Sequence, residues 1–395
     1  MSHNRPLFAD LEPETGQQRS LPRSTGVLPS QKIEEFCRDG SIRASFGGSG
    51  IAILPQQIQP ASLDLRLGSE AFRVRASFLP GKFSTVEEKM RGGLEMAAID
   101  LTHWDGAIFE KSCTYIVPLQ EELFLPEDVS GKANPKSTTG RLDIFTRLIT
   151  DYGTEFERVA PGYRGKLYLE VVPRTFSIKV REGTRLNQLR FVRGSPRPLR
   201  EDSSLGELHE QEPLVYTLDD APVDSGFSRI SVDLTEGPGL PVVGYKAKKY
   251  APLVDLSKVD YYDPDEFWEP IVPTQKIILD PGDFYLLISK EKFSIPPDHA
   301  GVMTAYDTSL GEFRIHYAGF FDPGFGYDLE QGKGTRAVLE VRSHEVPFVI
   351  EDGQVVGRLV YERLTEPPDK MYGAGIGSSY QAQGLSLSKQ FKRLA

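Results

Sequence analysis

An internal repeat with a spacing of about 170 residues constrains the fold of this chain more than any other feature of its sequence. Residues 115–131, YIVPLQEELFLPEDVSG, align with residues 285–301, YLLISKEKFSIPPDHAG, so that Tyr, Glu, Pro, Asp and Gly coincide at one fixed offset. The same offset carries the LEV at 169–171 onto the LEV at 339–341. Agreement at several places in one order is not expected by chance, so the chain is predicted to be a tandem duplication of one domain type.

Short apolar runs make up most of each half. FYLLIS, KLYLEVVP and LNQLRFV are rich in β-branched or aromatic residues, and turn residues such as Gly, Pro and Asp separate many such runs, which is typical of strands. Helices are predicted only at 30–39, where Ser30 is the expected N-cap and Gly40 the stop signal, and at 84–97. Many short strands joined by turns predict a mainly β fold, with a barrel or sandwich in each half.

Changes in composition mark the domain boundaries. The segment 194–225 is rich in Pro, Ser and acidic residues and is predicted to be a linker, although its EPLVYTL stretch is a candidate strand. It separates a first domain at 29–193 from a second at 226–378. Residues 1–28 are polar and are expected to form a mobile arm. Residues 379–395 are rich in Gly and Ser and are expected to be either a disordered end or a lid that closes over a ligand.

Charge and composition exclude some classes of function. The net charge of −10 argues against a protein that binds an extended phosphate backbone, so no nucleic-acid partner is expected. No stretch approaches the ~18 consecutive apolar residues of a membrane span. The two cysteines, Cys37 and Cys113, are expected to be unlinked thiols, with Cys37 buried on the core face of the first predicted helix. Together with the lack of a secretory signal, they indicate a cytoplasmic location.

The stretch NPKSTTGR at 134–141 has the composition of an anion-binding turn. It is not a Walker A loop, because that motif requires Gly directly before the Lys and here Pro precedes it. Charge-assisted hydrogen bonds from its side chains and free backbone N–H groups would suit a polyphosphate. The alternative is a surface turn whose hydroxyls cap a following helix. The side chains concerned are Lys136, Ser137, Thr138, Thr139 and Arg141.

Two glutamates stand at equivalent places within apolar strands, Glu170 in KLYLEVV and Glu340 in AVLEVRS. A buried carboxylate is costly unless it is paired, and burial raises its pKa toward the range useful for general acid–base catalysis. The alternative is an outward-facing residue on an alternating strand. The six His and two Cys residues do not form the pattern of a zinc-dependent deaminase, so no protein metal site is expected.

Six stretches, in order, resemble the dCTP deaminase branch of the dUTPase-like superfamily in a two-domain form. They are LPSQKIEEFCRDGSI, QPASLDLRLG, KSTTGR, PGYRGKLYLEV, HYAGFFDPGFG and SSYQAQG. The resemblance covers most of 29–193 and 228–390. It implies two tandem dUTPase-like distorted β-barrel domains with few short helices. It also implies assembly as a homo-oligomer, in this family a trimer with active sites between subunits. The implied reaction converts dCTP to dUTP and ammonia without zinc, supplying dUTP for thymidylate synthesis.

The resemblance also assigns roles to residues of this chain. It implies that one Glu takes a proton from water and delivers it to the base, while a Ser and an Arg orient the water. The implied catalytic residues are Ser137, Arg141, Glu170 and Glu340. The implied substrate-binding residues are Lys136, Thr138, Ala318, Gly319, Asp322, Tyr380, Gln381 and Gln383. Mg²⁺ is expected on the phosphates of dCTP or dUTP, and dTTP is a candidate inhibitor.

Each half departs from the family pattern at a different place. AYDTSLGEF replaces the phosphate turn in the second half and has no Lys. TEFERVAPG replaces the base-reading hairpin in the first half, with Phe156 where a small residue is expected and Ala160 where Asp is usual. We therefore predict a composite site, in which the 134–141 turn faces residues 316–322 and Glu340. Glu170 would be a vestigial copy, although a site built wholly from first-half copies stays open.

Two other functions stay open at this point. Asp322 in FFDPGFG resembles the water-activating Asp of dUTP pyrophosphatases, so the chain could be a dUTP pyrophosphatase or a bifunctional dCTP deaminase–dUTPase. The losses in each half also fit a non-catalytic protein that binds a pyrimidine nucleotide.

Overall fold

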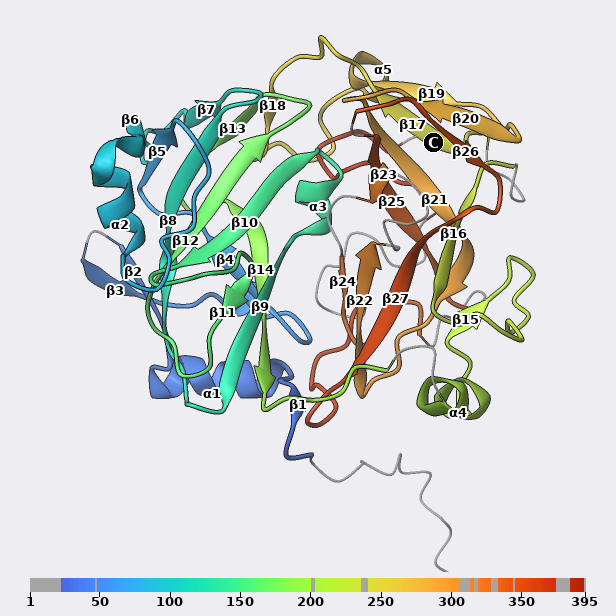
Figure 1. Cartoon of the computed structure of the whole chain (residues 1–395), viewed down its shortest axis with the longest axis horizontal. Coiled ribbons are helices and arrows are strands. Elements are labelled where there is room, and N and C mark those ends of the chain that lie inside the picture. Colours follow the sequence, from blue (N-terminus) through green and yellow to red (C-terminus); the bar gives the residue numbers. More distant parts are fainter. Residues whose placement is uncertain are drawn as a thin grey trace, which may run out of the picture.

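The computed structural model consists mainly of short antiparallel strands in curled sheets, with few short helices (Figure 1). The predicted mainly β class is confirmed. The described residues are 23–46, 48–199, 203–235, 241–305, 313–315, 319–327, 333–343, 345–373 and 384–393. The helices are α1 (Ser30–Asp39), α2 (Val86–Lys89), α3 (Ser137–Gly140), α4 (Ser203–Gln211) and α5 (Pro264–Phe267).

Strands β1 to β14 lie in the first half and β15 to β27 in the second. The first-half strands are β1 (Gly26–Val27), β2 (Ile42–Phe46), β3 (Ser49–Ile51), β4 (Leu63–Arg66), β5 (Glu70–Val74), β6 (Glu95–Asp100), β7 (Ala107–Phe109), β8 (Thr114–Phe124), β9 (Val129–Pro135), β10 (Ile144–Thr150), β11 (Arg158–Val159), β12 (Arg164–Pro173), β13 (Ile178–Val180) and β14 (Arg185–Arg193). The second-half strands are β15 (Val215–Tyr216), β16 (Arg229–Asp233), β17 (Gly244–Ala247), β18 (Val254–Asp255), β19 (Trp268–Ile271), β20 (Lys276–Leu279), β21 (Phe284–Phe293), β22 (His299–Ala305), β23 (Phe313–Ile315), β24 (Phe320–Phe321), β25 (Thr335–Ser343), β26 (Phe348–Glu351) and β27 (Val355–Arg363).

The pairing of the strands repeats the offset found in the sequence. Glu170 on β12 lies opposite Ile116 on β8, and Glu340 on β25 lies opposite Leu286 on β21, which is 170 residues further on both strands. Strands β14 and β27, which pair with β9 and β22, are displaced by the same 170 residues. Each half therefore builds the same framework around its own glutamate.

The two halves share a core, and one strand of the second half joins a sheet of the first. β18, from the second half, pairs in parallel with β13 of the first half. The Phe176 ring of the first half meets the Trp268 ring of the second at a centroid distance of 5.5 Å, and both belong to one buried cluster with Phe391. Burial of large aromatic side chains contributes strongly to stability. The halves are thus fixed against each other along one long seam.

Buried ion pairs also cross this seam. Arg190 on β14 is fully buried, and its Nη1 lies 3.4 Å from Glu362 Oε2 on β27. Arg342 on β25 donates to the carboxylate of Asp143 in the first half and, at 3.0 Å, to Thr175 Oγ1. Buried charges are tolerated when they are paired and hydrogen-bonded in this way. These contacts fix the position of β25, the strand that carries the second glutamate.

The boundaries of the predicted arm and linker differ from those in the structure. Residues 23–28 belong to the fold, because β1 pairs with β14 and Arg23 N donates to Thr365 O at 2.6 Å. The rest of the predicted 1–28 arm lies outside the described residues. Within the predicted linker, 194–225, the EPLVYTL stretch contributes β15, which pairs with β21, and helix α4 precedes it.

The helix predicted at 30–39 is present as α1. Its N-cap is Pro29 rather than Ser30, and Gly40 ends it in the left-handed region with φ of 82°. Cys37 packs against the core as predicted but is half-buried rather than buried, and desolvation raises the pKa of its thiol to about 11. The predicted 84–97 helix is shorter, because β6 begins at Glu95.

Among the described residues, no helix has the length and apolar character to cross a membrane.

Candidate active site

A cavity of about 570 Å³ lies between the two halves, with α3 on one side and β24 and β25 on the other. Seven of the predicted site residues line it: Lys136, Ser137, Thr138, Arg141, Gly319, Asp322 and Glu340. Glu170 does not line it. Ala318, Tyr380, Gln381 and Gln383 lie outside the described residues.

The turn at 136–141, predicted to bind an anion, follows directly from the end of β9. Lys136 has extended backbone angles, and its carbonyl oxygen accepts from the N–H groups of Thr139 and Gly140 at 2.8 and 3.0 Å. Thr139 Oγ1 donates to Leu186 O at 2.7 Å, so this hydroxyl fixes the turn against β14. No side chain caps α3, which disfavours the alternative of a hydroxyl cap. Ser137 and Thr138 are left facing the cavity.

A buried carboxylate from β4 orients the lysine of this turn. Lys136 Nζ lies 2.5 Å from Asp64 Oδ1, and Arg185 Nη1 lies 3.5 Å from Asp64 Oδ2. Sequence reasoning did not include Asp64 among the site residues. The repeat held a signal for it, because SLDLRLG recurs as SVDLTEG and the second-half copy, Asp233, also pairs with a buried arginine, Arg336, at 2.5 Å.

Glu340 points across the seam at the turn. Its side chain is 6% exposed, and a Cβ added to Gly140 would stand only 2.4 and 2.5 Å from its two carboxylate oxygens. Only glycine therefore fits at this place in the turn without moving the carboxylate. Burial raises the pKa of Glu340 well above its usual range, Arg141 works against this shift, and Asp143 adds to it. A carboxyl group with a raised pKa holds its proton more readily than an ordinary glutamate, as a general acid must.

The C-terminal segment lies on the turn. Arg141 Nη1 donates to Ser386 O at 2.8 Å and to Ser386 Oγ at 2.7 Å. Ser388 Oγ donates to Thr138 O at 2.9 Å. The described part of the predicted 379–395 lid, residues 384–393, is thus attached to the 136–141 turn. Sequence reasoning missed Ser386 because its partner, Arg141, is 245 residues away.

Asp322 occupies the far wall of the cavity, directly after β24. It is 9% exposed, and its Oδ1 lies 3.6 Å from Arg190 Nη2. Burial raises its pKa, while the positive charges of Arg190 and Lys136 act in the opposite direction. Gly319, just before β24, accepts from Met303 N at 3.0 Å through its carbonyl oxygen.

The equivalent space in the first half is filled by its own side chains. Glu170 is 1% exposed, and its Oε1 accepts from Arg147 Nη2 at 2.6 Å and from Arg147 Nε at 2.9 Å. The Arg147 guanidinium stacks 3.6 Å from the centre of the Phe156 ring. Behind them Glu157 is half-buried beside Asn187 with its Oε2 shielded from solvent, and this burial raises its pKa to about 8. The first-half glutamate therefore takes part in an internal ion pair.

Fold and site together define a duplicated mainly β protein, in which a cationic turn of one half faces a buried carboxylate of the other. The models of the N-terminal and C-terminal domains of 2′-deoxycytidine 5′-triphosphate deaminase match residues 24–195 and 201–391. The chain belongs to the dCTP deaminase family, and the resemblance found in the sequence is confirmed.

Solved and curated relatives agree with this assignment. A crystal structure of 2′-deoxycytidine 5′-triphosphate deaminase from Agrobacterium tumefaciens superposes with a TM-score of 0.80 and 48% identity, covering 87% of this chain and all of that one. A protein named "dCTP deaminase, dUMP-forming" from Mycobacterium ulcerans is 35% identical over 135 residues, 32% of this chain and 67% of that protein. One of the same name from Corynebacterium glutamicum is 29% identical over 179 residues, 42% of this chain and 89% of that protein.

Proposed function

We propose that this chain hydrolyses the amine of dCTP to give dUTP and ammonia, without zinc, and so supplies dUTP for thymidylate synthesis. The proposal rests above all on the buried carboxyl group of Glu340, which lies against Gly140 in the 136–141 turn of the other half. Membership of the dCTP deaminase family supports it. The site is composite, since the turn is contributed by the first half and the carboxyl group by the second.

In this proposal Glu340 is the general acid and base. It takes a proton from water as the oxygen adds to C4 of cytosine, gives a proton to N3, and then assists the departure of ammonia. Its raised pKa favours the protonated form, which delivers the proton to the base. Arg141 and Ser137, which line the same cavity, orient the water and stabilise the negative charge that develops on oxygen.

The phosphates would lie over the turn, against Lys136 and the hydroxyl of Thr138. Ala318 and Gly319 would read the base, and Tyr380, Gln381 and Gln383 would close over the triphosphate, as the family resemblance implies. Mg²⁺ would be held by the nucleotide's own phosphate oxygens and would offset part of their charge. Among the described residues, no group of three or more His, Cys, Asp or Glu side chains could hold a metal ion.

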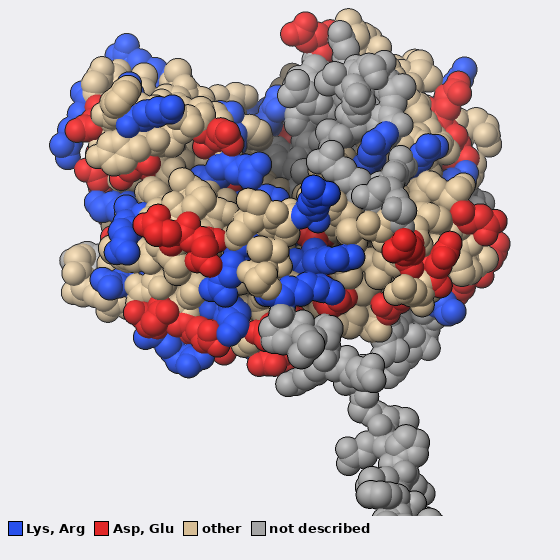
Figure 2. All heavy atoms as spheres, turned by 60° about the horizontal axis from the view of Figure 1, so that its bottom comes forward, with Lys and Arg blue, Asp and Glu red and all other residues tan. Residues whose placement is uncertain are grey.

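Two properties of the proposed enzyme follow from the resemblance alone. They are inhibition by dTTP and a homo-oligomeric assembly, with a trimer the state that the family implies. A cytoplasmic location is proposed from the two unlinked cysteines. On the face seen in Figure 2, Lys and Arg side chains gather near the centre and patches of Asp and Glu lie to either side, so the basic area is limited in extent. Gel filtration with light scattering would measure the assembly.

A second candidate function is a deaminase that continues to dUMP. Two observations favour it: curated relatives carry the name dUMP-forming, and a second buried carboxylate, Asp322, lines the same cavity close enough to Lys136 for its pKa to be affected. A carboxylate beside bound phosphates could activate water for attack on phosphorus. In that case the triphosphate would be cleaved as well as the amine.

Product analysis tests the proposal and separates the candidates. Purified protein is incubated with dCTP and Mg²⁺, with and without a zinc-selective chelator, while nucleotides are resolved and ammonia is assayed. The proposal predicts dUTP and ammonia in equal amounts, unaffected by the chelator. Formation of dUMP and pyrophosphate would support the second candidate. Binding of dCTP without turnover would contradict both and indicate a nucleotide-binding protein.

A further inference from the structure

Three cationic side chains from separate segments gather at the first-half wall of the cavity. They are Lys136 on the turn, Arg185 at the start of β14 and Lys389 in the C-terminal segment. Lys136 and Arg185 share one carboxylate, Asp64. Lys389 has no ion-pair partner within the described part of the chain. Three positive charges around one negative charge leave an excess that an anion would neutralise.

The pKa of Lys389 agrees with an excess of positive charge at this wall of the cavity. Its pKa is lowered by partial burial and by the charges of Lys136 and Arg185, while Asp64 acts in the opposite direction. The ammonium group is therefore held near two other cations, with the carboxylate of Asp64 as partial compensation. Such an arrangement is costly in the free protein and becomes favourable when a polyanion binds.

The backbone on either side of Lys389 is firmly held, although its side chain reaches the cavity. Ser388, Gln390 and Phe391 are 1%, 2% and 3% exposed. The carbonyl oxygen of Lys389 accepts from Asp260 N at 2.9 Å. The Phe391 ring lies in an aromatic cluster with the rings of Tyr262, Phe267 and Trp268. The lysine is thus placed by a buried anchor rather than by a loose chain end.

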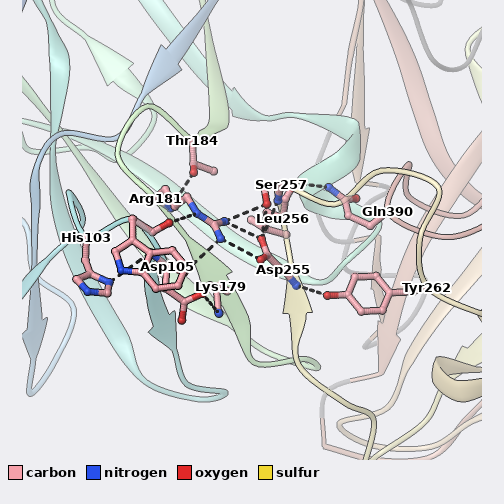
Figure 3. Close-up of polar contacts among 11 residues, drawn as sticks. His103, Asp105, Lys179, Arg181, Thr184, Asp255, Leu256, Ser257, Tyr262 and Gln390 are labelled. Atoms are coloured by element: carbon pink, nitrogen blue, oxygen red, sulfur yellow. Dashed lines mark hydrogen bonds and ion pairs between the residues drawn. The ribbon is translucent and has the colours of Figure 1, made fainter.

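The contacts drawn in Figure 3 connect the segment around Gln390 with Thr184, the residue before Arg185. Gln390 Nε2 donates to Leu256 O at 3.2 Å, and the neighbouring Asp255 carboxylate accepts from Arg181 Nη1 and Nη2 at 2.8 and 3.1 Å. Arg181 N in turn donates to Thr184 Oγ1 at 3.0 Å, just before Arg185. These contacts hold Gln390 and Thr184, the chain neighbours of Lys389 and Arg185, on the same side of the cavity.

We propose that Lys389 is a substrate-binding residue that contacts the distal phosphates of the nucleotide, and that with Lys136 and Arg185 it makes the site prefer a triphosphate to a monophosphate. The inference rests on the proposed function and adds a residue to the site. A monophosphate carries less negative charge and ends short of the distal phosphates, so it gains less from the third cation.

The test compares Lys389→Ala with Lys392→Ala, an exposed lysine three residues along the same segment. Steady-state kinetics give KM and kcat for dCTP, and competition gives the inhibition constant of dCMP. Loss of a charge-assisted contact should raise the KM for dCTP about tenfold in Lys389→Ala, with kcat and the dCMP constant within about twofold of wild type. Lys389→Arg should recover most of the affinity, and Lys392→Ala should behave like wild type.

An unchanged KM in Lys389→Ala, or an equal loss of affinity for dCTP and dCMP, would overturn the inference. A thermal melt of each variant separates loss of contact from loss of the anchor, and Lys389→Arg keeps the test valid if the alanine variant unfolds. If the wild-type protein does not turn over dCTP, the proposed function fails first. Calorimetry with tripolyphosphate then decides the inference: tenfold weaker binding by Lys389→Ala supports it, and equal binding overturns it.

Discussion

Glu170 and Glu340 occupy equivalent register positions on equivalent strands, but the groups that surround them differ. Glu170 meets Arg147 from the neighbouring strand of its own half, and Phe156 closes the space beyond it. Glu340 meets Gly140 of the other half and faces a cavity. One glutamate is neutralised by an internal partner, whereas the other is buried with a raised pKa beside an open site.

The different surroundings of Glu170 and Glu340 show how a duplicated chain can divide one site between its two copies. Both halves keep the framework, as the matching hydrogen bonds from Glu110 N to Tyr115 Oη and from Asp280 N to Tyr285 Oη, each 2.9 Å long, illustrate. What has diverged are a few side chains at the glutamate. In our account the first half supplies the phosphate turn and the second supplies the acid–base residue. Substitutions in the two halves should therefore have different effects on stability and on activity.

Arg147→Met should have the largest effect on stability. It leaves Glu170 buried without its partner, and removal of one member of a buried ion pair costs about 3 kcal/mol of unfolding free energy. Chemical denaturation at pH 8 measures the loss, and the double variant Arg147→Met/Glu170→Met should regain much of it. Activity per folded molecule should stay near wild type. A folded Arg147→Met protein without activity would place the chemistry in the first half instead.

Gly140→Ala should have the next largest effect, on activity rather than stability. The new Cβ would stand within 2.6 Å of the Glu340 carboxyl group, so that group must move. A displacement of about 1 Å can lower a rate about 100-fold. Steady-state kinetics would measure the loss. Gly206→Ala is the matched control, because a Cβ there meets nothing within 4 Å. Wild-type activity in Gly140→Ala would argue against a catalytic Glu340.

Glu157→Gln should change how stability depends on pH. Because the folded-state pKa of Glu157 is raised from 4.5 to about 8, its stabilising contribution is present below pH 4.5 and is lost as the pH rises through about 8. The variant should match wild type near pH 4.5, and its advantage in unfolding free energy should then grow by about 1.4 kcal/mol per pH unit until the pH reaches about 8. Glu155→Gln, which is exposed, controls for the charge change. Parallel pH profiles for Glu157→Gln and wild type would refute the prediction.

Tyr115→Phe and Tyr285→Phe should give the smallest effects, and equal ones. Each removes one part-buried hydrogen bond from a backbone N–H group, worth about 1 kcal/mol of unfolding free energy, and Tyr285→Phe also removes a long contact from the hydroxyl to Ile278 O at 3.5 Å. Denaturation curves of the two variants would compare the frameworks directly, with Tyr250→Phe, 99% exposed, as the control. A large difference between the two variants would mean that the frameworks have diverged as well as the sites.

The fold class and the division of the site between halves could be predicted from local patterns and from the repeat. The offset of 170 fixed which strands are equivalent, and the departures at Phe156 and at the second-half turn suggested a site divided between halves. It did not reach contacts that depend on how the halves meet. Nothing local indicates that β18 joins a first-half strand, or that Ser386 accepts from Arg141, because such pairs are set by tertiary packing. Arg147 was overlooked because a charged residue in IFTRLIT is also typical of an outward-facing strand position.

The most direct measurement compares Glu340→Gln with Glu170→Gln. Both substitutions remove one carboxylate from equivalent positions, so kcat/KM for dCTP, corrected for the folded fraction, isolates the chemistry from the fold. Our account predicts that Glu340→Gln loses about 100- to 10,000-fold, the usual contribution of a general acid–base residue, while Glu170→Gln stays within a few-fold of wild type. Loss of activity in Glu170→Gln with Glu340→Gln still active would contradict the composite site.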